Sequence, residues 1–398
     1  MKWEYKTLDQ LGTVSRGKSK HRPRNDPKLF GGKYPFVQTA DVKNADYYIT
    51  KYSDTYNESG LAQSKLWDEG TLCITIAANI ADTGVLAFPA CFPDSIMGFV
   101  PFEGVANTRF IKYCFDRLQR DCKQISQGTA QDNLSWEKLS TIKFCIPEYK
   151  EQCRIADILS AYDDLIENNQ KQIKLLEEAA QRLYKEWFVD LRFPGHENMK
   201  IVDGVPEGWS TSTVSEVSAV LRRGISPKYN EKARGIVINQ KCIRQTIVSY
   251  DEARTQEKKY PAELEMMESD IVICSTGAGT LGRVGQIFEA KENVTLDSHV
   301  TLIRANEKIG QQSLFWSLKM KQDYLMNAGK GSTNQLELSR ETIGSCEILI
   351  PERKIAEQVE KNFVAIHNKM KECSMQIARL REARNLLLPK LMSGEVEV

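Results

Sequence analysis

Two short loops rich in arginine and lysine are the clearest candidates for chemistry in this chain. The first runs from Arg16 to Arg24, and the second begins at Arg222-Arg223-Gly224. Such side chains in flexible loops can neutralise DNA phosphates and reach base edges in a major groove. On charge alone a solvated surface loop is the better interpretation, but an Arg-Gly pair recurs at matching places and makes DNA binding an equal alternative. The candidate DNA-binding residues are Arg16, Lys18, Lys20, Arg22, Arg24, Lys28, Arg222, Arg223, Lys228, Lys232 and Arg234.

A phosphate-loop pattern overlaps the first basic loop. The segment from Gly12 to Ser19 fits G-x-x-x-x-G-K-[ST]. That loop works only between a buried strand and a helix whose N-terminus faces the phosphates. The stretch before it, from Trp3 to Leu11, is polar, and the basic stretch after it meets Pro23 too soon for a helix. The sequence therefore disfavours a nucleotide site here.

A second glycine pattern invites a dinucleotide interpretation. The segment from Gly277 to Gly282 fits G-x-G-x-x-G and follows a predicted strand, Ile271–Cys274. A dinucleotide fold then needs a helix. The residues from Arg283 to Phe288 are instead typical of a turn into a second strand. We predict that these glycines form a hairpin.

The sequence offers no credible catalytic centre or metal site. It has no N/D-P-P-Y/F amino-methyltransferase motif and no H-E-x-x-H, and its ten cysteines include no C-x-x-C pair. Neither a signal-peptide core nor an apolar run near the ~20 residues of a membrane span is present. We expect reduced cysteines in a cytoplasmic protein, with no catalytic residue, no metal and no cofactor bound by this chain.

The chain repeats itself at a constant offset of 204 residues. Over about fifty residues without a gap, Ile146-Pro147 is matched by Ile350-Pro351, and the match runs on to Leu183 and Leu387. Two long copies mean a duplicated domain with internal pseudo-twofold symmetry. The starts of the halves also match, for instance Gly17 with Gly224, but the regions between share little beyond short apolar runs. We therefore expect two divergent heads on matched rods, each head recognising something different.

The matched regions carry apolar residues at alternating spacings of four and three, which is a coiled-coil seam. Each helix of some 33 residues would be about 50 Å long at ~1.5 Å per residue. The preferred interpretation is an antiparallel pair in which Asn169 fixes the register, and the alternative is two amphipathic helices in separate domain cores. The predicted packing positions are Ile155, Leu159, Tyr162, Ile166, Ile173, Leu176 and Leu183 in the first helix, and Val359, Phe363, Ile366, Met370, Ile377, Leu380 and Leu387 in the second.

The heads are predicted to be α+β, with irregular, loop-rich sheets. Short β-rich runs such as Thr71–Ile76 and Ile236–Ile238 lie among Gly, Asn, Asp and Pro, and the tracts Phe110–Leu118 and Leu314–Met320 look helical. The expected organisation is a first recognition domain (1–150), a first spacer helix (151–190), a linker (191–208), a second recognition domain (209–351), a second spacer helix (352–392) and a tail (393–398), with Pro147-Glu148 and Pro351-Glu352 at the helix starts.

Several segments together resemble one family. They are Trp187 to Gly195 (WFVDLRFPG), Val205 to Trp209 (VPEGW) and Leu386 to Glu395 (LLLPKLMSGE), supported by Gly128-Thr129 and Gly331-Ser332-Thr333 before each helix start. Over its whole length the chain resembles the DNA-sequence-specificity subunit of a type I restriction–modification enzyme.

The resemblance implies two target-recognition domains, each reading one half of an interrupted, asymmetric site in double-stranded DNA. It implies that the two helices act as a ruler and dock two methyltransferase subunits, which bring S-adenosylmethionine and methylate adenine. Motor-nuclease subunits would add ATP- and Mg-dependent translocation and cleavage. This chain would carry none of that chemistry and would not contact a membrane.

Two other classes remain open at this point. A nucleotide-binding protein using Gly12 to Ser19 would be revealed by a nucleotide-binding assay. A two-headed scaffold whose heads bind proteins would be separated by a salt-dependent gel shift with duplex DNA, run with and without methyltransferase partners.

Overall fold

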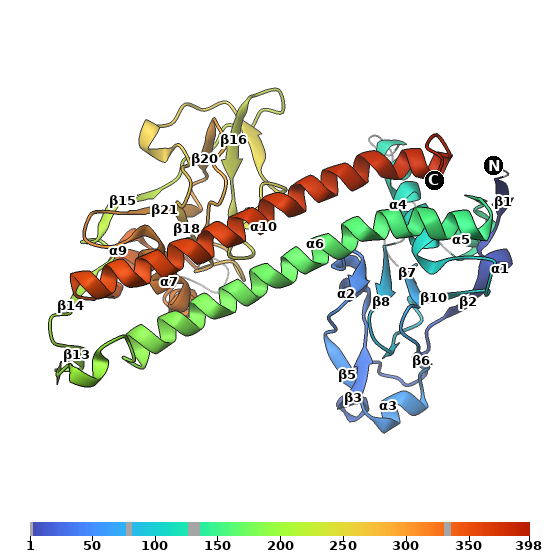
Figure 1. Ribbon diagram of the computed structural model, residues 1–398, viewed down its shortest axis with the longest axis horizontal. Helices are drawn as coiled ribbons and strands as arrows, with labels where there is room; N and C mark the ends of the chain where they lie inside the picture. The colour runs from blue at the N-terminus through green and yellow to red at the C-terminus, as the bar shows by residue number, and fades with distance from the viewer. Residues whose placement is uncertain (1–2, 77–81, 126–135, 330–335) are drawn as a thin grey trace. The chain divides into compact units, whose positions relative to one another are not determined.

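The structure, a computed structural model, describes residues 3–76, 82–125, 136–329 and 336–398. The chain forms two compact units, one comprising Met1–Asn168 with Ile377–Val398 and the other Asn169–Gln376. Two long helices, α6 (Tyr149–Tyr184) and α10 (Arg353–Ser393), each contribute to both units (Figure 1). Each unit therefore contains one head and a stretch of each long helix.

A five-stranded sheet with the order β2-β10-β7-β8-β4 forms the centre of the first head. Strand β10 is antiparallel to both β2 and β7, and β4 lies parallel to β8. Every residue of β7 and β8 is buried, and α4 (Thr108–Ile125) packs its apolar side chains into the same core. The strands are β2 (Gly12–Arg16), β10 (Ile96–Pro101), β7 (Leu72–Thr75), β8 (Thr83–Leu86) and β4 (Tyr48–Ile49).

A second sheet, β5-β3-β9-β6, and a two-stranded ladder, β1-β11, complete the first head. The ladder ties the start of the head to the strand that leads into α6. The strands are β1 (Glu4–Lys6), β3 (Phe30–Phe36), β5 (Asp54–Tyr56), β6 (Leu66–Trp67), β9 (Ala90–Cys91) and β11 (Phe144–Ile146), and the short helices are α1 (Leu8–Leu11), η1 (Pro27–Leu29), α2 (Thr39–Lys43), α3 (Glu58–Ala62) and α5 (Trp136–Thr141).

The second head repeats this architecture with sheets β15-β21-β18-β19, β17-β16-β20 and β14-β22. The strands are β14 (Ser210–Thr213), β15 (Ser218–Arg223), β16 (Gly235–Ile238), β17 (Arg254–Gln256), β18 (Ile271–Cys274), β19 (Val284–Gln286), β20 (Val294–Leu296), β21 (Val300–Ala305) and β22 (Glu347–Ile350). The helices are η4 (Gln240–Cys242), η5 (Ala262–Leu264), α7 (Gln311–Met320), α8 (Gln322–Asn327) and α9 (Arg340–Gly344). The connection from α6 holds η2 (Lys185–Val189), η3 (His196–Asn198), β12 (Ile201–Val202) and β13 (Val205–Pro206).

Strand register aligns the two heads residue by residue. Arg16 pairs with Met97 in the first head, and Arg223 pairs with Thr301 in the second. Cys91 and Thr295 likewise hold matching places beside β3 and β16. Met97 and Thr301 are 204 residues apart, as are Cys91 and Thr295. The duplication thus extends through the sheets, where the sequence showed only short apolar matches.

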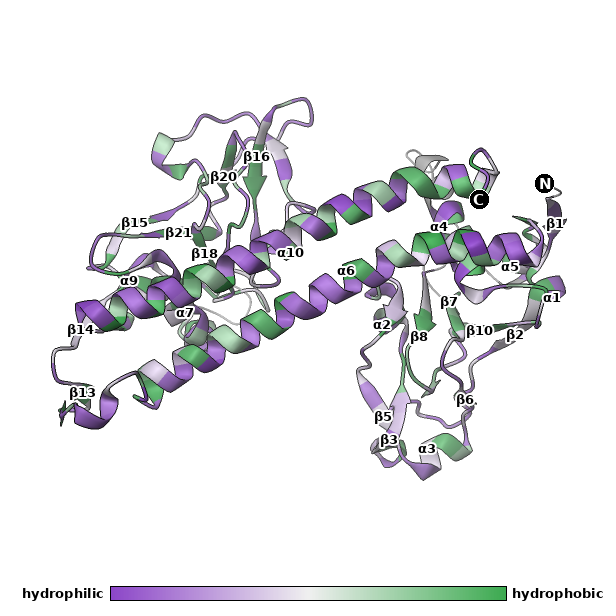
Figure 2. Ribbon diagram, viewed as in Figure 1, coloured by the Kyte–Doolittle hydropathy of each residue, from purple (hydrophilic) through white to green (hydrophobic). Residues whose placement is uncertain are grey.

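Within each unit, a stretch of α6 lies beside a stretch of α10 and runs in the opposite direction (Figure 1). In the first unit Arg154 donates to the carbonyl of Val398 at 3.2 Å, while Asp163, further along α6, forms an ion pair with the earlier residue Arg384. In the second unit the Cys373 thiol donates to Gln172 Oε1 at 3.5 Å. Figure 2 shows apolar residues recurring among polar ones along both helices. Each unit therefore contains a stretch of α6 and a stretch of α10 paired antiparallel, as predicted.

The apolar seams of the long helices also belong to the cores of the heads. Ile155 and Leu159 are buried in one core with Phe110, and Phe363 packs on Trp316 of α7 with ring centroids 6.1 Å apart. The alternative of separate domain cores is therefore correct in part. All predicted packing positions have little exposure: Ile155, Leu159, Ile166, Val359, Phe363, Met370 and Ile377 are buried, and Tyr162, Ile173, Leu176, Leu183, Ile366, Leu380 and Leu387 are half-buried. Asn169, whose register role stays a prediction, is buried as well.

A buried carboxylate fixes the first head to the helix pair. Asp163 of α6 is 2% exposed as a side chain, accepts a hydrogen bond from the Tyr113 hydroxyl at 2.6 Å, and is ion-paired with Arg384 of α10. Burial raises the pKa of Asp163, and Arg384 and Tyr113 oppose that rise. Arg384 occupies a seam position of α10, and the structure makes it the counter-ion of a buried acid.

The equivalent place on α10 carries different chemistry. His367 lies 204 residues after Asp163, and its Nδ1 is 3.1 Å from Gln286 Oε1, while its ring stacks on Phe288. Burial lowers the pKa of His367 to about 4, so the ring is neutral at physiological pH. About two turns earlier in α10, Glu360 accepts hydrogen bonds from the backbone N–H groups of Gln312 and Ser313 at the start of α7. Each head is thus held by its own set of polar contacts.

Both glycine patterns adopt the structures expected from the sequence. Gly12–Arg16 is strand β2, and the next helical turn along the chain is η1, so no helix N-terminus follows the phosphate-loop pattern. The segment from Gly277 to Gly282 connects β18 and β19, which pair antiparallel as a hairpin. The predicted strands and helices around residues 72, 110, 236, 271 and 314 are also present. Within the described residues, no helix is both long enough and apolar enough to cross a membrane.

Candidate nucleic-acid interface

Each head presents an arginine followed by a glycine at the end of an edge strand of its main sheet. The Gly17 backbone N–H donates to the carbonyl of Ile96 at 2.9 Å, and that of Gly224 donates to the carbonyl of Val300 at 3.0 Å. A Cβ at Gly17 would lie 2.3 Å from the carbonyl oxygen of Phe92, and one at Gly224 would lie 2.1 Å from that of Leu296. Only glycine fits at these places, because the backbone passes so close to its neighbour. The recurring Arg-Gly pair therefore marks an equivalent site in both heads.

The first basic loop is partly fixed by internal contacts. Arg22 donates to the carbonyl oxygens of Ser19 and His21, at 2.6 and 2.8 Å, and Arg24 forms a 2.8 Å ion pair with Asp94. Both arginine side chains remain about half exposed. Among the described residues, Arg16, Lys18, Lys20 and Lys28 have no ion pair and are exposed. Within the described residues, this loop therefore offers four cations that no ion pair neutralises.

Lys65 joins this basic surface from a distant part of the chain. Its ammonium lies 3.5 Å from the centroid of the Trp67 ring, and the neighbouring Ser64 hydroxyl donates to the Lys18 carbonyl at 2.8 Å. Partial burial, and secondly the charge of Lys18, lower the pKa of Lys65. Two cations that repel each other favour an anion between them, so Lys65 and Lys18 suit a phosphate. The candidates chosen from the sequence did not include Lys65, because it lies 47 residues from Lys18.

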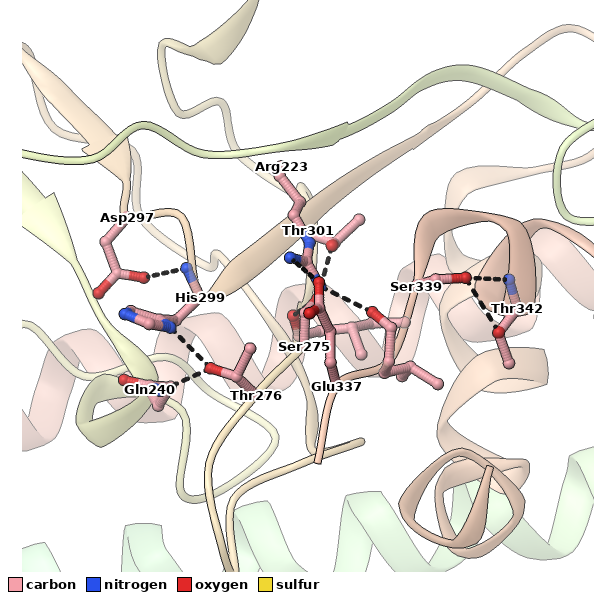
Figure 3. A network of polar contacts seen from close by, with 12 residues as sticks. Arg223, Gln240, Ser275, Thr276, Asp297, His299, Thr301, Glu337, Ser339 and Thr342 are labelled. Atoms are coloured by element: carbon pink, nitrogen blue, oxygen red, sulfur yellow. Dashed lines mark hydrogen bonds and ion pairs between the residues drawn. The ribbon is translucent and has the colours of Figure 1, made fainter. Parts of the chain in front are cut away.

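The second basic loop is more fully neutralised. Arg222 is ion-paired with Glu263, and Lys228 with Glu257. Arg223 binds Glu337 at 2.5 Å and also donates to the Leu338 carbonyl at 2.9 Å (Figure 3). Lys232 and Arg234 are exposed and have no ion pair among the described residues. The two loops that looked alike in sequence thus differ in how much free charge they present.

A network of polar side chains lies beside Arg223. The ends of β15 and β18, the turn from β20 to β21, and the start of η4 meet there (Figure 3). Gln240 Nε2 donates to Thr276 Oγ1 at 3.1 Å, and Thr276 Oγ1 lies 2.7 Å from His299 Nδ1. Amide, hydroxyl and imidazole groups can read the hydrogen-bonding edges of base pairs. None of these three residues was a candidate from the sequence. The offset of 204 residues matches His299 with Ser95, so it shows a histidine in the second head where the first head has a serine.

Nothing in this network is arranged for catalysis or metal binding. No group of three or more His, Cys, Asp or Glu that could hold a metal occurs among the described residues. The nine cysteines whose side chains the structure describes are free thiols. Gly128-Thr129 and Gly331-Ser332-Thr333, which supported the family resemblance, lie outside the described residues.

A family model for the type I restriction modification DNA specificity domain matches this chain twice, over residues 1–178 and 206–372. The chain belongs to this family. The two matches coincide with the two heads and the helical segments that follow them. Relatives of this chain are type I restriction enzyme specificity subunits. The role of the chain is recognition of DNA within a restriction–modification system.

Individual relatives of this specificity subunit support the assignment over its full length. The MjaIX type I specificity subunit of Methanocaldococcus jannaschii is 26% identical over 421 aligned positions, covering 100% of this chain and 94% of that protein. The HindI specificity subunit of Haemophilus influenzae is 25% identical and covers 66% of this chain and 71% of that protein. The crystal structure of a type I S subunit from M. genitalium has a TM-score of 0.58 at 17% identity, covering 98% and 96% of the two chains, and so shares the fold.

Proposed function

We propose that each head of this specificity subunit reads one half of an interrupted, asymmetric duplex site. The observation that carries this proposal is the combination of a repeated framework with different exposed chemistry. The Arg-Gly sites superpose by register, yet Arg16 has no ion pair among the described residues whereas Arg223 is held by Glu337. A duplicated framework with two different surfaces suits two different half-sites. The recognition domains would be residues 1–150 and 209–351.

In the first head, contact with DNA would be mainly electrostatic at the basic loop. Lys18, Lys20 and Lys65 supply cations without ion pairs among the described residues, and Arg22 and Arg24 add exposed guanidinium groups. Such contacts orient a protein on the duplex and give affinity that falls with salt. In the second head, Lys232 and Arg234 would take this role, while Arg222, Arg223 and Lys228 are available only if their glutamate partners release them.

The long helices would set the spacing of the half-sites and bind the other subunits. Their antiparallel pairing in each unit supports a ruler, because antiparallel rods carry their attached heads at a fixed separation. Membership of the specificity-subunit family supports docking of partner proteins on the helices. We propose two methyltransferase subunits there, with motor-nuclease subunits joining the complex.

The chemistry of modification and cleavage would reside in those partners. They would bring S-adenosylmethionine, ATP and Mg, and this chain would bind none of them. The complex would act on host and incoming DNA in the cytoplasm.

The function is tested with the complex of this chain and its methyltransferase subunits. We expect salt-dependent binding to duplex DNA and adenine methylation at one bipartite sequence. Binding to every sequence with equal affinity, or methylation without sequence preference, would contradict the proposal. A nucleotide-binding assay on this chain without its partner subunits tests the alternative of a nucleotide-binding protein. We expect no nucleotide to bind.

Neutralising the unpaired lysines should reduce the salt dependence of DNA binding. Lys18→Gln and Lys20→Gln should each flatten the slope of log affinity against log salt by about 0.9, the value for one lost phosphate contact. Arg22→Gln and Arg24→Gln should flatten it less, because Asp94 already neutralises part of their charge. Lys143→Gln, an exposed lysine of the same head, is the matched control. If all four loop variants keep the original slope and sequence preference, the loop is only a solvated surface.

A further inference from the structure

The two heads differ in chemistry at three positions that their shared register places side by side in the second head. Because Cys91 and Thr295 are equivalent, Thr39 corresponds to Gln240, each directly after the residue that caps a short helix. Because Met97 and Thr301 are equivalent, Ser95 corresponds to His299, and Ala77, outside the described residues, corresponds to Thr276. Positions that vary on a constant framework are where two readers of different sequences should differ.

The three side chains of the second head form one hydrogen-bonded set. In Figure 3, both Gln240 and His299 point to the Thr276 hydroxyl, at 3.1 and 2.7 Å. The backbone around the set is also fixed, because the His299 N–H donates to Asp297 Oδ1 at 2.9 Å and Thr280 Oγ1 donates to the Thr276 carbonyl at 3.0 Å. His299 is exposed, and Gln240 and Thr276 are half-buried. The set is therefore ordered before any ligand arrives, with the imidazole on its outer side.

The hydrogen bonds decide which groups are left for a ligand. The Thr276 oxygen accepts from the Gln240 amide. In the His299 tautomer that carries its hydrogen on Nε2, Nδ1 accepts from the Thr276 hydroxyl and Nε2 is a donor for a ligand. Gln240 keeps its carbonyl oxygen and one amide hydrogen for further bonds. In the major groove both purines present N7 as an acceptor, and guanine adds O6.

We propose that His299 and Gln240 read a purine in the half-site of the second head, with Thr276 as their positioning residue. This inference rests on the proposed DNA-recognition function and adds the residues and the base class. Lys241 is exposed and follows Gln240 in the chain, so its ammonium is available to a DNA phosphate near the purine. At the matching positions Thr39 and Ser95 lack a ring donor and an amide, so the first head would read its own half-site with other groups.

The test compares variants in the assembled methyltransferase complex. His299→Ala should reduce discrimination for a purine at one position of the second half-site by roughly 5- to 150-fold, the range that 1–3 kcal/mol per base pair gives. Thr276→Val removes the hydroxyl but keeps the shape, and it should relax the same position. Thr276→Ser should restore discrimination. Thr211→Val, at an exposed threonine of β14, is the matched control. The readout is methylation of duplexes that compete and differ at one base pair.

The outcomes separate this inference from the general function. Unchanged discrimination in both His299→Ala and Thr276→Val would overturn the inference, and so would relaxation confined to the first half-site. Uniform loss of methylation at every sequence in a variant that still assembles would also overturn it, because that pattern indicates a structural role. If instead the unmodified complex shows no sequence preference, the proposed function itself is wrong.

Discussion

Replacing Arg384 by methionine is expected to lower the free energy of unfolding of the unit that contains the first head by about 3–5 kcal/mol. Asp163 is almost inaccessible to solvent, and Arg384 is its counter-ion. Removing the arginine leaves a buried carboxylate whose one remaining hydrogen-bond partner among the described residues is the Tyr113 hydroxyl. The measurement is chemical denaturation of the wild type and the Arg384→Met variant at neutral pH.

Two controls make this prediction specific. Arg381 lies on the same helix as Arg384 and forms an exposed ion pair with Asp46 of the first head. Arg381→Met should lower the free energy of unfolding by less than about 1 kcal/mol. Adding Asp163→Asn to Arg384→Met should recover much of the loss, because no charge is then buried. Equal effects for Arg381→Met and Arg384→Met would contradict the role given to the buried pair.

The stability deficit of Arg384→Met should depend on pH. Burial already raises the pKa of Asp163 in the folded state, so the native protein holds this proton more tightly than the unfolded chain does. Stability from this group therefore falls as pH rises past the unfolded value near 3.9. Without Arg384 the folded pKa rises further, and the deficit should be small below about pH 4 and complete at neutral pH. A deficit that does not change with pH would indicate lost packing instead.

Removing one heptad from each long helix is expected to contract the gap between half-sites by about three base pairs. Deleting Ile166–Gln172 and Met370–Gln376 keeps the seam in register and shortens the pair by roughly 10 Å at ~1.5 Å per residue. DNA rises about 3.4 Å per base pair. The polar contacts of Asp163, Glu360 and His367 with the heads lie outside both deleted segments.

The half-site sequences should survive this deletion, although binding should weaken because the half-sites are turned by nearly a third of a helical turn. The measurement is sequencing of methylated adenines produced by the shortened complex. Deleting the heptad from α6 alone is the control, and it should disrupt the pairing because α6 is then one heptad shorter than the stretch of α10 that it pairs with. A doubly shortened variant that assembles and methylates at the original spacing would show that the helices are not the ruler.

Local patterns in this sequence predicted local structure well. The four-three spacing from Ile155 and from Val359 predicted α6 and α10, and the residues after Gly282 predicted the β18-β19 hairpin. Such features depend on neighbours in sequence, through periodicity, turns and helix breakers. The Arg-Gly recurrence also pointed to an equivalent place in both sheets, because the close backbone approach at Gly17 and Gly224 permits only glycine.

Contacts between distant residues could not be predicted in this way. The local sequence around Arg384 does not reveal its partner, because Asp163 is 221 residues away. Arg24 and Asp94 are 70 residues apart, and Arg223 and Glu337 are 114 apart, so sequence alone could not show which cations are already neutralised. Polar residues such as Gln240, Thr276 and His299 follow no local sequence pattern that would mark them as binding residues. Only the folded sheet ends bring them together.

If each head reads its own half-site, exchanging one head should alter only one half of the methylated motif. Residues 209–351 would be replaced by the second head of another family member, chosen with a glutamine at the position of Gln286 so that His367 keeps its partner. The exchanged chain is expressed with its methyltransferase subunits, and the methylated adenines in host DNA are sequenced. We expect one half of the bipartite motif to change while the other half stays the same. A motif that changes in both halves, or in neither, would contradict it.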